Sequence, residues 1–287
     1  MIINACQSRV EHLEINLKKP PQSSSGEIST KGLRDASLGD HNVFFYASSR
    51  EKHETLFSNL KAGMHRGCAA LYIADRENSA QIRAEMQNFG LDLDNPTRLK
   101  IVSSTEWYTP DGEFQADRVI KQFRTLTDEN IGKGFKGLYV SSDAADIFDH
   151  LSINITPWLK YESSLGRTFE FPMEAICAYN IDQTKSNNQA LLQLVGAHKN
   201  IITSKSANFL DCKELCIEAI TETLNELLGK DTSKVILYHL EKKFKISQNQ
   251  IPDRIATLDN ALENIFGSAT SLIKQAISRN LTRKIEV

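Results

Sequence analysis

Polar and aromatic side chains follow several predicted strands, where they could bind a small molecule. The carboxyl ends of parallel strands meet at one edge of a sheet, and open α/β sheets bind their ligands there. We therefore expect one open rim that includes both Tyr46 and Glu162. The candidate ligand-binding residues are Tyr46, Ser48, Ser49, Trp107, Tyr108, Glu162, Tyr179 and Asn180.

The turn after the first predicted strand occupies the position where nucleotide-binding α/β proteins hold phosphate. A phosphate cradle needs glycines, which let the backbone wrap the phosphates, and then a lysine that neutralises them. The turn A-S-S-R-E at 47–51 has neither, and the chain contains no G-x-x-x-x-G-K-[ST] motif. Ser48 and Glu51 fit a helix capping box. The alternative is that Ser48, Ser49 and the first helix amides hold a small polar or anionic ligand with help from Arg50.

Glu162 lies on an aromatic face of a predicted helix. The segment P-W-L-K-Y-E-S-S-L places Glu162 on the same side as Trp158, Tyr161 and Leu165. Burial of a carboxylate there is costly unless it is paired, and burial would raise its pKa. Glu162 is therefore either in water at the edge of this face or an inward acid that contacts a ligand or supports the structure.

Other reactive side chains give no positive evidence of catalysis. His41 and His198 flank the predicted sheet, and a lone histidine is more often a satisfied core or surface residue than a ligand. No spacing of His, Cys and carboxylate residues matches a zinc site; Cys212 and Cys216 lack nearby partners. The chain also has no G-x-S-x-G motif. We expect a binding protein without metal or cofactor, and not an enzyme.

Strands and helices alternate between residues 39 and 205. The predicted strands cover 41–46, 68–74, 99–103, 135–141, 173–179 and 200–203, with helices at 48–65, 77–89, 115–127, 156–165 and 185–196. The segment T-E-W-Y-T-P-D-G-E-F is a predicted loop. Because the strands are almost continuously apolar, we expect a mostly parallel sheet with helices on both faces, and the fold class is α/β.

The pattern changes to helices alone after residue 205. Amphipathic helices are predicted at 211–228, 232–244, 255–266 and 269–281, and Ile251-Pro252 marks a helix start. Such helices cannot each bury an apolar stripe alone, so they should form a small all-α bundle or a homodimer surface. The predicted domains are a flexible segment at 1–38, with at most a short helix near 5–17, an α/β domain at 39–205 and a helical domain at 206–287.

The composition of the chain indicates which classes of partner and which cellular compartment to expect. The chain has 287 residues, of which 40% are hydrophobic, and its net charge is only -2. A core can form, and no global charge favours nucleic acid or a membrane surface. The five cysteines are odd in number and two fall in predicted strands, which is typical of reduced thiols and predicts a cytoplasmic protein. No apolar run approaches about 18 residues.

Short blocks spread over the α/β region carry a resemblance to a known family. They are H-N-V-F-F-Y, G-M-H-R-G-C-A-A-L-Y-I, W-Y-T-P-D-G-E-F, W-L-K-Y-E-S-S-L and A-I-C-A-Y-N, followed by His198. Together they resemble the MEDS domain, a sensory domain shared by methanogen proteins and the DcmR regulator of methylotrophs. The resemblance implies a fold related to the RecA and KaiC ATPases without their phosphate loop, and a role in sensing small hydrocarbon derivatives. Asn180 stands where the family commonly has Asp, which puts a charged role there in doubt.

The end of the chain is similar to a helical output domain of archaeal signalling proteins. The residues that carry this similarity are I-L-Y-H-L-E-K-K-F at 236–244, Ile251-Pro252 and A-L-E-N-I-F-G-S-A at 261–269. Our hypothesis is a cytoplasmic signal-transduction sensor whose α/β domain binds a small molecule and whose tail relays the signal to a protein partner. The alternatives are a KaiC-like ATPase with a non-standard phosphate site, a transcription regulator that acts through the tail, and a structural scaffold.

Overall fold

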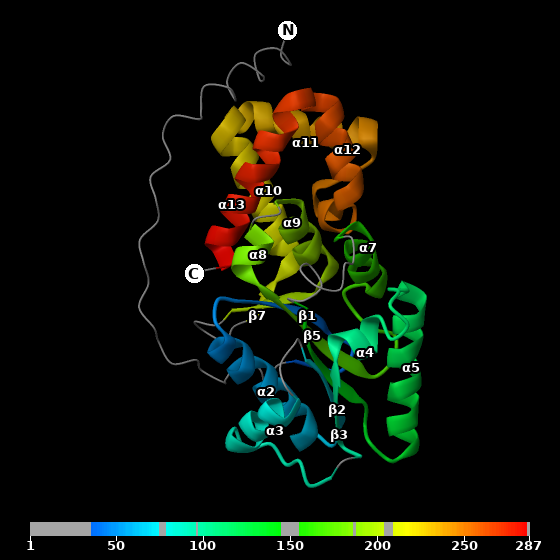
Figure 1. Cartoon of the computed structure of the whole chain (residues 1–287). Coiled ribbons are helices and arrows are strands. Elements are labelled where there is room, and N and C mark those ends of the chain that lie inside the picture. Colours follow the sequence, from blue (N-terminus) through cyan, green and yellow to red (C-terminus); the bar gives the residue numbers. More distant parts are fainter. Residues whose placement is uncertain are drawn as a thin grey trace.

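The computed structural model describes residues 36–74, 79–95, 97–144, 155–185, 188–203 and 209–285 (Figure 1). A layered α/β part precedes a region of helices alone, which confirms the predicted fold class. The short helix predicted near residues 5–17 lies outside the described residues. Within the described ranges, no helix combines the length and the apolar character needed to cross a membrane.

One sheet of seven strands forms the centre of the α/β part. Its strands are β1 (His41–Tyr46), β2 (Ala69–Ala74), β3 (Leu99–Ser103), β4 (Leu138–Asp143), β5 (Met173–Asn180), β6 (Asn200–Ile202) and β7 (Phe209–Asp211). They follow the order β3-β2-β4-β5-β1-β6-β7, and all pairs are parallel except β6 with β7. β1 and β2 are parallel, as predicted, although β4 and β5 lie between them.

Side chains alternate between the two faces of this sheet, so each strand serves two cores. Val43, Cys177 and Tyr179 contribute to the core beneath helices α7 and α9. Phe44 and Tyr46, at the intervening positions of β1, contribute to the core beneath α2 and α3. We name these faces the α7 side and the α2 side.

Helices cover both faces, as the continuous apolar strands predict. The α2 side carries α2 (Ser49–His65) and α3 (Ser79–Asn88), and the α7 side carries α5 (Ala116–Gly132), α7 (Ile155–Leu165) and α9 (Asn188–Ala197). Ser48 caps α2 as expected, because its side chain accepts a hydrogen bond from the Glu51 amide at 3.3 Å. The Glu51 carboxylate accepts in return from the Ala47 amide at 2.9 Å.

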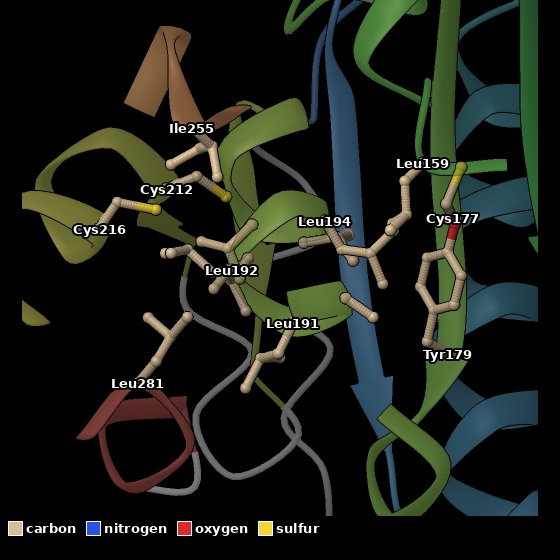
Figure 2. Packing of buried hydrophobic residues seen from close by; sticks show 14 of the residues in the cluster. Leu159, Cys177, Tyr179, Leu191, Leu192, Leu194, Cys212, Cys216, Ile255 and Leu281 are labelled. Carbon is tan, nitrogen blue, oxygen red and sulfur yellow. The ribbon is translucent and has the colours of Figure 1, made fainter. Parts of the chain in front are cut away.

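The C-terminal helices continue the core of the α7 side. They are α10 (Cys212–Leu228), α11 (Lys230–Phe244), α12 (Ile255–Phe266) and α13 (Thr270–Ile285), with short 3-10 helices at Gln248–Asp253 and Gly267–Ala269. Figure 2 shows Leu192 of α9 among Cys212, Cys216 and Leu281, whereas Leu194 points toward Leu159 and Cys177. α9 is therefore apolar on opposite sides because it lies between the sheet and the tail.

Two local predictions are wrong, and one short helix was not predicted. The stretch predicted as a loop contains a short helix, α4 (Ser104–Tyr108), which a capping box between Ser103 and Glu106 stabilises. The helix predicted at 185–196 is confirmed as α9, and the short helix α8 (Ile181–Lys185), which precedes it in the chain, was not predicted. Pro252 does not start a helix but lies inside the 3-10 helix Gln248–Asp253, and α12 begins at Ile255.

Candidate functional site

A cluster of four buried polar residues lies between the sheet and helices α7 and α9. His41 is the first residue of β1, Cys177 is in β5, Glu162 is in α7, and His198 directly follows α9. Strand alternation turns His41 and Cys177 to the α7 side, where the two helices supply the other members. All four side chains are buried, and one nitrogen, sulfur or oxygen atom of each lies within 4.8 Å of those of the other three. We name these residues the His-Glu-Cys cluster.

One carboxylate oxygen is at the centre of the cluster. Glu162 Oε2 lies 3.4 Å from His41 Nε2 and 3.5 Å from His198 Nε2. His41 Nε2 also lies 3.5 Å from Cys177 Sγ. The second carboxylate oxygen, Oε1, accepts a hydrogen bond of 2.5 Å from the Tyr179 hydroxyl. The two imidazole rings pack together, with centroids 4.0 Å apart.

Burial and neighbouring groups set the protonation of this cluster. Burial raises the pKa of Glu162, but the two imidazoles and the Tyr179 hydroxyl act in the opposite direction and leave it below its usual value. Burial together with the nearby His41 lowers the pKa of His198 to about 3. Burial raises the pKa of the Cys177 thiol well above its ordinary value. Glu162 is therefore a carboxylate at neutral pH, His198 is neutral and Cys177 is a thiol.

Aromatic residues enclose the cluster on the side of the carboxyl ends of the strands. Trp158 Nε1 donates to the Tyr179 hydroxyl at 3.0 Å, and the Tyr108 ring packs edge-on against Trp158 at 5.0 Å. The Tyr108 hydroxyl forms a 2.8 Å hydrogen bond with the Ser142 hydroxyl. Burial raises the pKa of Tyr108 well above its ordinary value, so the phenol stays protonated.

A second polar group lies on the opposite face of the sheet, beneath α2. The Tyr46 hydroxyl donates to Asp143 Oδ1 at 3.0 Å, and Lys52 Nζ lies 2.6 Å from Asp143 Oδ2. Asp143 is fully buried and only 5% of the Lys52 side chain is exposed. The predicted turn at 47–51 contains no lysine, but Lys52 follows it directly, within the first turn of α2. Its charge is matched by Asp143, at the end of β4.

The α2 side also contains a buried carboxyl group held by amides. Asn42 and Asn59 donate to Glu174 at 2.9 and 2.8 Å. Burial outweighs these two hydrogen bonds and raises the pKa of Glu174 to about 8. At neutral pH this residue is mostly a neutral acid, unlike Glu162.

A groove of about 600 Å³ opens between α2 and α3. Phe57 and Phe89 pack edge to face in it, with ring centroids 5.8 Å apart, and His53 pairs with Glu85 across it at 2.7 Å. The residues that line the groove are Ser49, Arg50, His53, Glu54, Phe57, Gln81, Glu85, Asn88 and Phe89. It therefore combines an apolar wall with polar and charged groups.

The structure does not bring the eight predicted residues into one rim. Tyr108, Glu162 and Tyr179 lie together on the α7 side, whereas Tyr46 is on the α2 side of the sheet. Both Tyr46 and Glu162 are buried, at 5% and 0% exposure, so the expected open rim between them is wrong. Glu162 is the inward acid of the two alternatives.

The remaining predicted residues have separate surroundings. Ser48 caps α2, and Ser49 lines the groove. Trp107 is buried against Phe123, and its Nε1 has no hydrogen-bond partner in the part of the chain that the structure describes. Asn180 accepts hydrogen bonds from the amides that open α8, at 2.9 and 3.3 Å.

Most of the His-Glu-Cys cluster was not predicted from the sequence. The sequence predicts lone histidines at His41 and His198, and a small buried thiol at Cys177. Spacing rules could not find the group, because its members come from four elements that are far apart in the chain. The alternation of side chains along a strand could have found part of it. His41 and Cys177 lie on the same face of neighbouring strands as Tyr179, which is a predicted ligand-binding residue.

A comparison with known families gives one match. The model of the family described as the MEthanogen/methylotroph, DcmR Sensory domain (MEDS) matches residues 40–199, more than half of the chain. These residues contain β1 to β5, the groove and all four members of the His-Glu-Cys cluster. No curated protein matches the chain.

Proposed function

Because the chain belongs to the MEDS family of sensory domains, we propose that it is a cytoplasmic signal-transduction sensor. In this proposal the α/β part binds a small molecule, and the C-terminal helices relay binding to a protein partner. A sensor of this kind needs a ligand site and a mechanical connection from that site to the tail.

The observation that carries the proposal is the groove between α2 and α3. It starts at Ser49, beside the carboxyl end of β1, which is the edge where open α/β sheets bind ligands. Phe57 and Phe89 offer an apolar wall, and His53 and Glu85 offer polar side chains that lie 2.7 Å apart. This combination suits a small molecule that has a short apolar part and one polar group, such as a hydrocarbon derivative.

The connection to the tail runs through β1, β6 and α9. β1 leads into α2 and pairs with β6, and β6 follows α9 after a short turn. α9 in turn contacts the tail closely, because a Cβ atom at Gly196 would lie 3.1 Å from the Pro252 carbonyl and 3.1 Å from Ile255. A ligand shifts the tail only if it binds one arrangement better than another.

A thermal-shift series tests the ligand site. Short-chain alcohols, amines and carboxylic acids are added separately to the full chain, and at least one class should raise Tm, since a ligand selective for the folded state stabilises it. Gln81→Trp fills the groove and should abolish that shift. Gln87→Trp, on an exposed position of α3 that does not line the groove, is the matched control and should preserve it. Equal shifts in both variants would place the ligand elsewhere.

Three further measurements separate this proposal from its rivals. Hydrogen exchange in α10 and α13 should change when the stabilising compound is added; unchanged exchange would contradict the relay. Isothermal titration with ATP and magnesium should show no tight binding or turnover, because no glycine cradle is present and Asp143 matches the charge of Lys52. Tight ATP binding with turnover would favour the ATPase alternative, and salt-dependent DNA binding would favour a transcription regulator.

A further inference from the structure

Both histidines of the His-Glu-Cys cluster use one ring nitrogen for a backbone hydrogen bond and turn the other toward the cluster. The Nδ1 atom of His41 lies 2.8 Å from the Gly166 carbonyl, and that of His198 lies 2.6 Å from the Leu194 carbonyl. A carbonyl oxygen can only accept, so both Nδ1 atoms carry a proton. The other nitrogen, Nε2, is then the one that can bind a metal ion. Both Nε2 atoms face the cluster, at 3.4 and 3.5 Å from Glu162 Oε2.

Two polar atoms of the cluster lack a partner within the described ranges. The Cys177 thiol can donate only one hydrogen, and its neighbour is His41 Nε2 at 3.5 Å. Among the described residues, Glu162 Oε2 and His198 Nε2 have no hydrogen-bond partner. Two fully buried polar atoms thus lie 3.5 Å apart without a hydrogen-bond partner in this part of the chain, which is an unfavourable arrangement that a bound ion would relieve.

The separations fit a four-coordinate metal ion. Zinc binds His nitrogen and carboxylate oxygen at about 2.0–2.2 Å and Cys sulfur at about 2.3 Å, so the edges of a tetrahedron around it are about 3.3–3.7 Å. The contacts of Glu162 with His41 and His198, and of His41 with Cys177, are 3.4, 3.5 and 3.5 Å. All donor atoms lie within 4.8 Å of one another, so small side-chain movements would complete the tetrahedron.

The surrounding groups have the arrangement expected of an outer shell. Metal-binding histidines almost always donate their other N–H to a carbonyl or carboxylate, and ligating carboxylates are themselves hydrogen-bonded. Here the carbonyls of Gly166 and Leu194 accept from the two histidines, and the Tyr179 hydroxyl donates to Glu162 Oε1. These contacts hold the two rings and the carboxylate so that one donor atom of each lies within 4.8 Å of the Cys177 sulfur.

We propose that His41, Glu162, Cys177 and His198 bind a divalent transition-metal ion, with Zn²⁺ the best match. Two imidazoles, one carboxylate and one thiolate form a borderline-soft donor set that suits zinc and gives a closed, four-coordinate site. Binding converts the Cys177 thiol to a thiolate, and its proton leaves to solvent. The site is independent of the groove, so either proposal can fail while the other holds.

The ion would fasten two helices to the sheet. Glu162 belongs to α7 and His198 ends α9, whereas His41 and Cys177 belong to the neighbouring strands β1 and β5. α9 is also the helix on which α10 and α13 pack. Metal binding would therefore hold α9, and with it the packing surface of the tail, in place against the sheet.

Metal analysis of the full chain is the first test. The protein is expressed in zinc-supplemented medium and purified with reductant but without chelator, and it should contain about one zinc per chain. In parallel, the chain is refolded from denaturant with Co²⁺. The expected spectrum has the intense visible bands of four-coordinate cobalt and a near-ultraviolet thiolate-to-cobalt band. Absence of both zinc and this spectrum from the folded wild-type chain would overturn the proposal.

Variants assign the signal to the cluster. Cys177→Ala should remove the thiolate band and weaken zinc binding more than about 100-fold, which exceeds the usual effect of losing an outer-shell partner. Cys216→Ala, at a buried cysteine on α10, is the matched control and should keep the spectrum. Should Cys177→Ala fail to fold, Glu162→Gln retains the side-chain shape and should weaken binding by a similar factor. A cobalt spectrum unchanged in Cys177→Ala, or in Glu162→Gln, would assign the metal to another site and refute the proposal.

Discussion

Two buried glutamates on opposite faces of the sheet show how neighbouring groups decide protonation. Glu162 has two imidazoles close to its carboxylate, and its pKa stays below the usual value despite burial. Glu174 has only amide donors, and burial raises its pKa to about 8. The same side chain is thus charged on one face and neutral on the other at pH 7.

Glu174 should make stability depend on pH. Between its ordinary pKa of 4.5 and the folded value of about 8, the folded state holds a proton that the unfolded state has lost, so stability falls as pH rises. In urea unfolding between pH 5 and 8, Glu174→Gln should make the slope of unfolding free energy against pH less negative by about 1.4 kcal/mol per pH unit. Glu170→Gln, at an exposed side chain, should leave the slope unchanged. Equal slopes in Glu174→Gln and wild type would contradict the raised pKa.

The direction of individual side chains explains why the predicted rim was wrong. The prediction used only the position of residues at strand ends, which places Tyr46 and Tyr179 together. Phe45 is the residue that pairs with Tyr179, so Tyr46 points to the other face. A shift of one residue along a strand reverses the face of the sheet. The alternation of side chains along β1 can be read from the sequence, and it would have placed Tyr46 on the opposite face from Glu162 and Tyr179.

At the scale of elements, periodicity predicted most of the fold. The strand Leu99–Ser103 and the helix Ile255–Phe266 have the predicted bounds, because each has a clear apolar pattern bounded by turn residues. β7 and α4 were missed because three and five residues are too short to show a period. β7 depends on pairing with β6, which is a tertiary contact, and α4 depends on a capping box inside a stretch that also contains a turn signal.

The approach of α2 to β4 gives a prediction at this scale. A Cβ atom at Gly63 would lie 2.2 Å from the ring of Tyr139, a distance that real contacts do not reach. Although alanine favours helices, Gly63→Ala should lower the free energy of unfolding by about 1–3 kcal/mol, because α2 must move away from the sheet. Gly132→Ala, where nothing lies within 4 Å, is the matched control in α5 and should raise it by up to about 1 kcal/mol. Urea unfolding measures both; a neutral or stabilising Gly63→Ala would contradict this packing.

At the scale of the whole molecule, the α/β part and the tail share one apolar core. Residues of β5, α9, α10, α12 and α13 belong to a single buried cluster. Asn280 of α13 reinforces the packing, since it donates to the Ala219 carbonyl and to Thr223 of α10. Separate unfolding of the tail would expose the apolar surface of α9.

The two parts should therefore unfold in one transition. Both tryptophans, Trp107 and Trp158, lie in the α/β part, so their fluorescence reports that part, whereas far-ultraviolet circular dichroism reports all helices. In urea the two signals should have the same midpoint. Leu192→Ala should lower both midpoints together, by about 2–5 kcal/mol in unfolding free energy. Val235→Ala, at a half-exposed position of α11, should change it by less than about 0.5 kcal/mol. Separate midpoints in wild type would show independent units.

Burial of the two cysteine sulfur atoms in α10 makes them unreactive in the folded protein. Burial raises the pKa of Cys212 well above its ordinary value and that of Cys216 to about 12. The thiolate is the form that peroxide and alkylating reagents attack, so both residues are protected by protonation as well as by shielding. Oxidative damage at these two positions would have to begin with local opening of the tail.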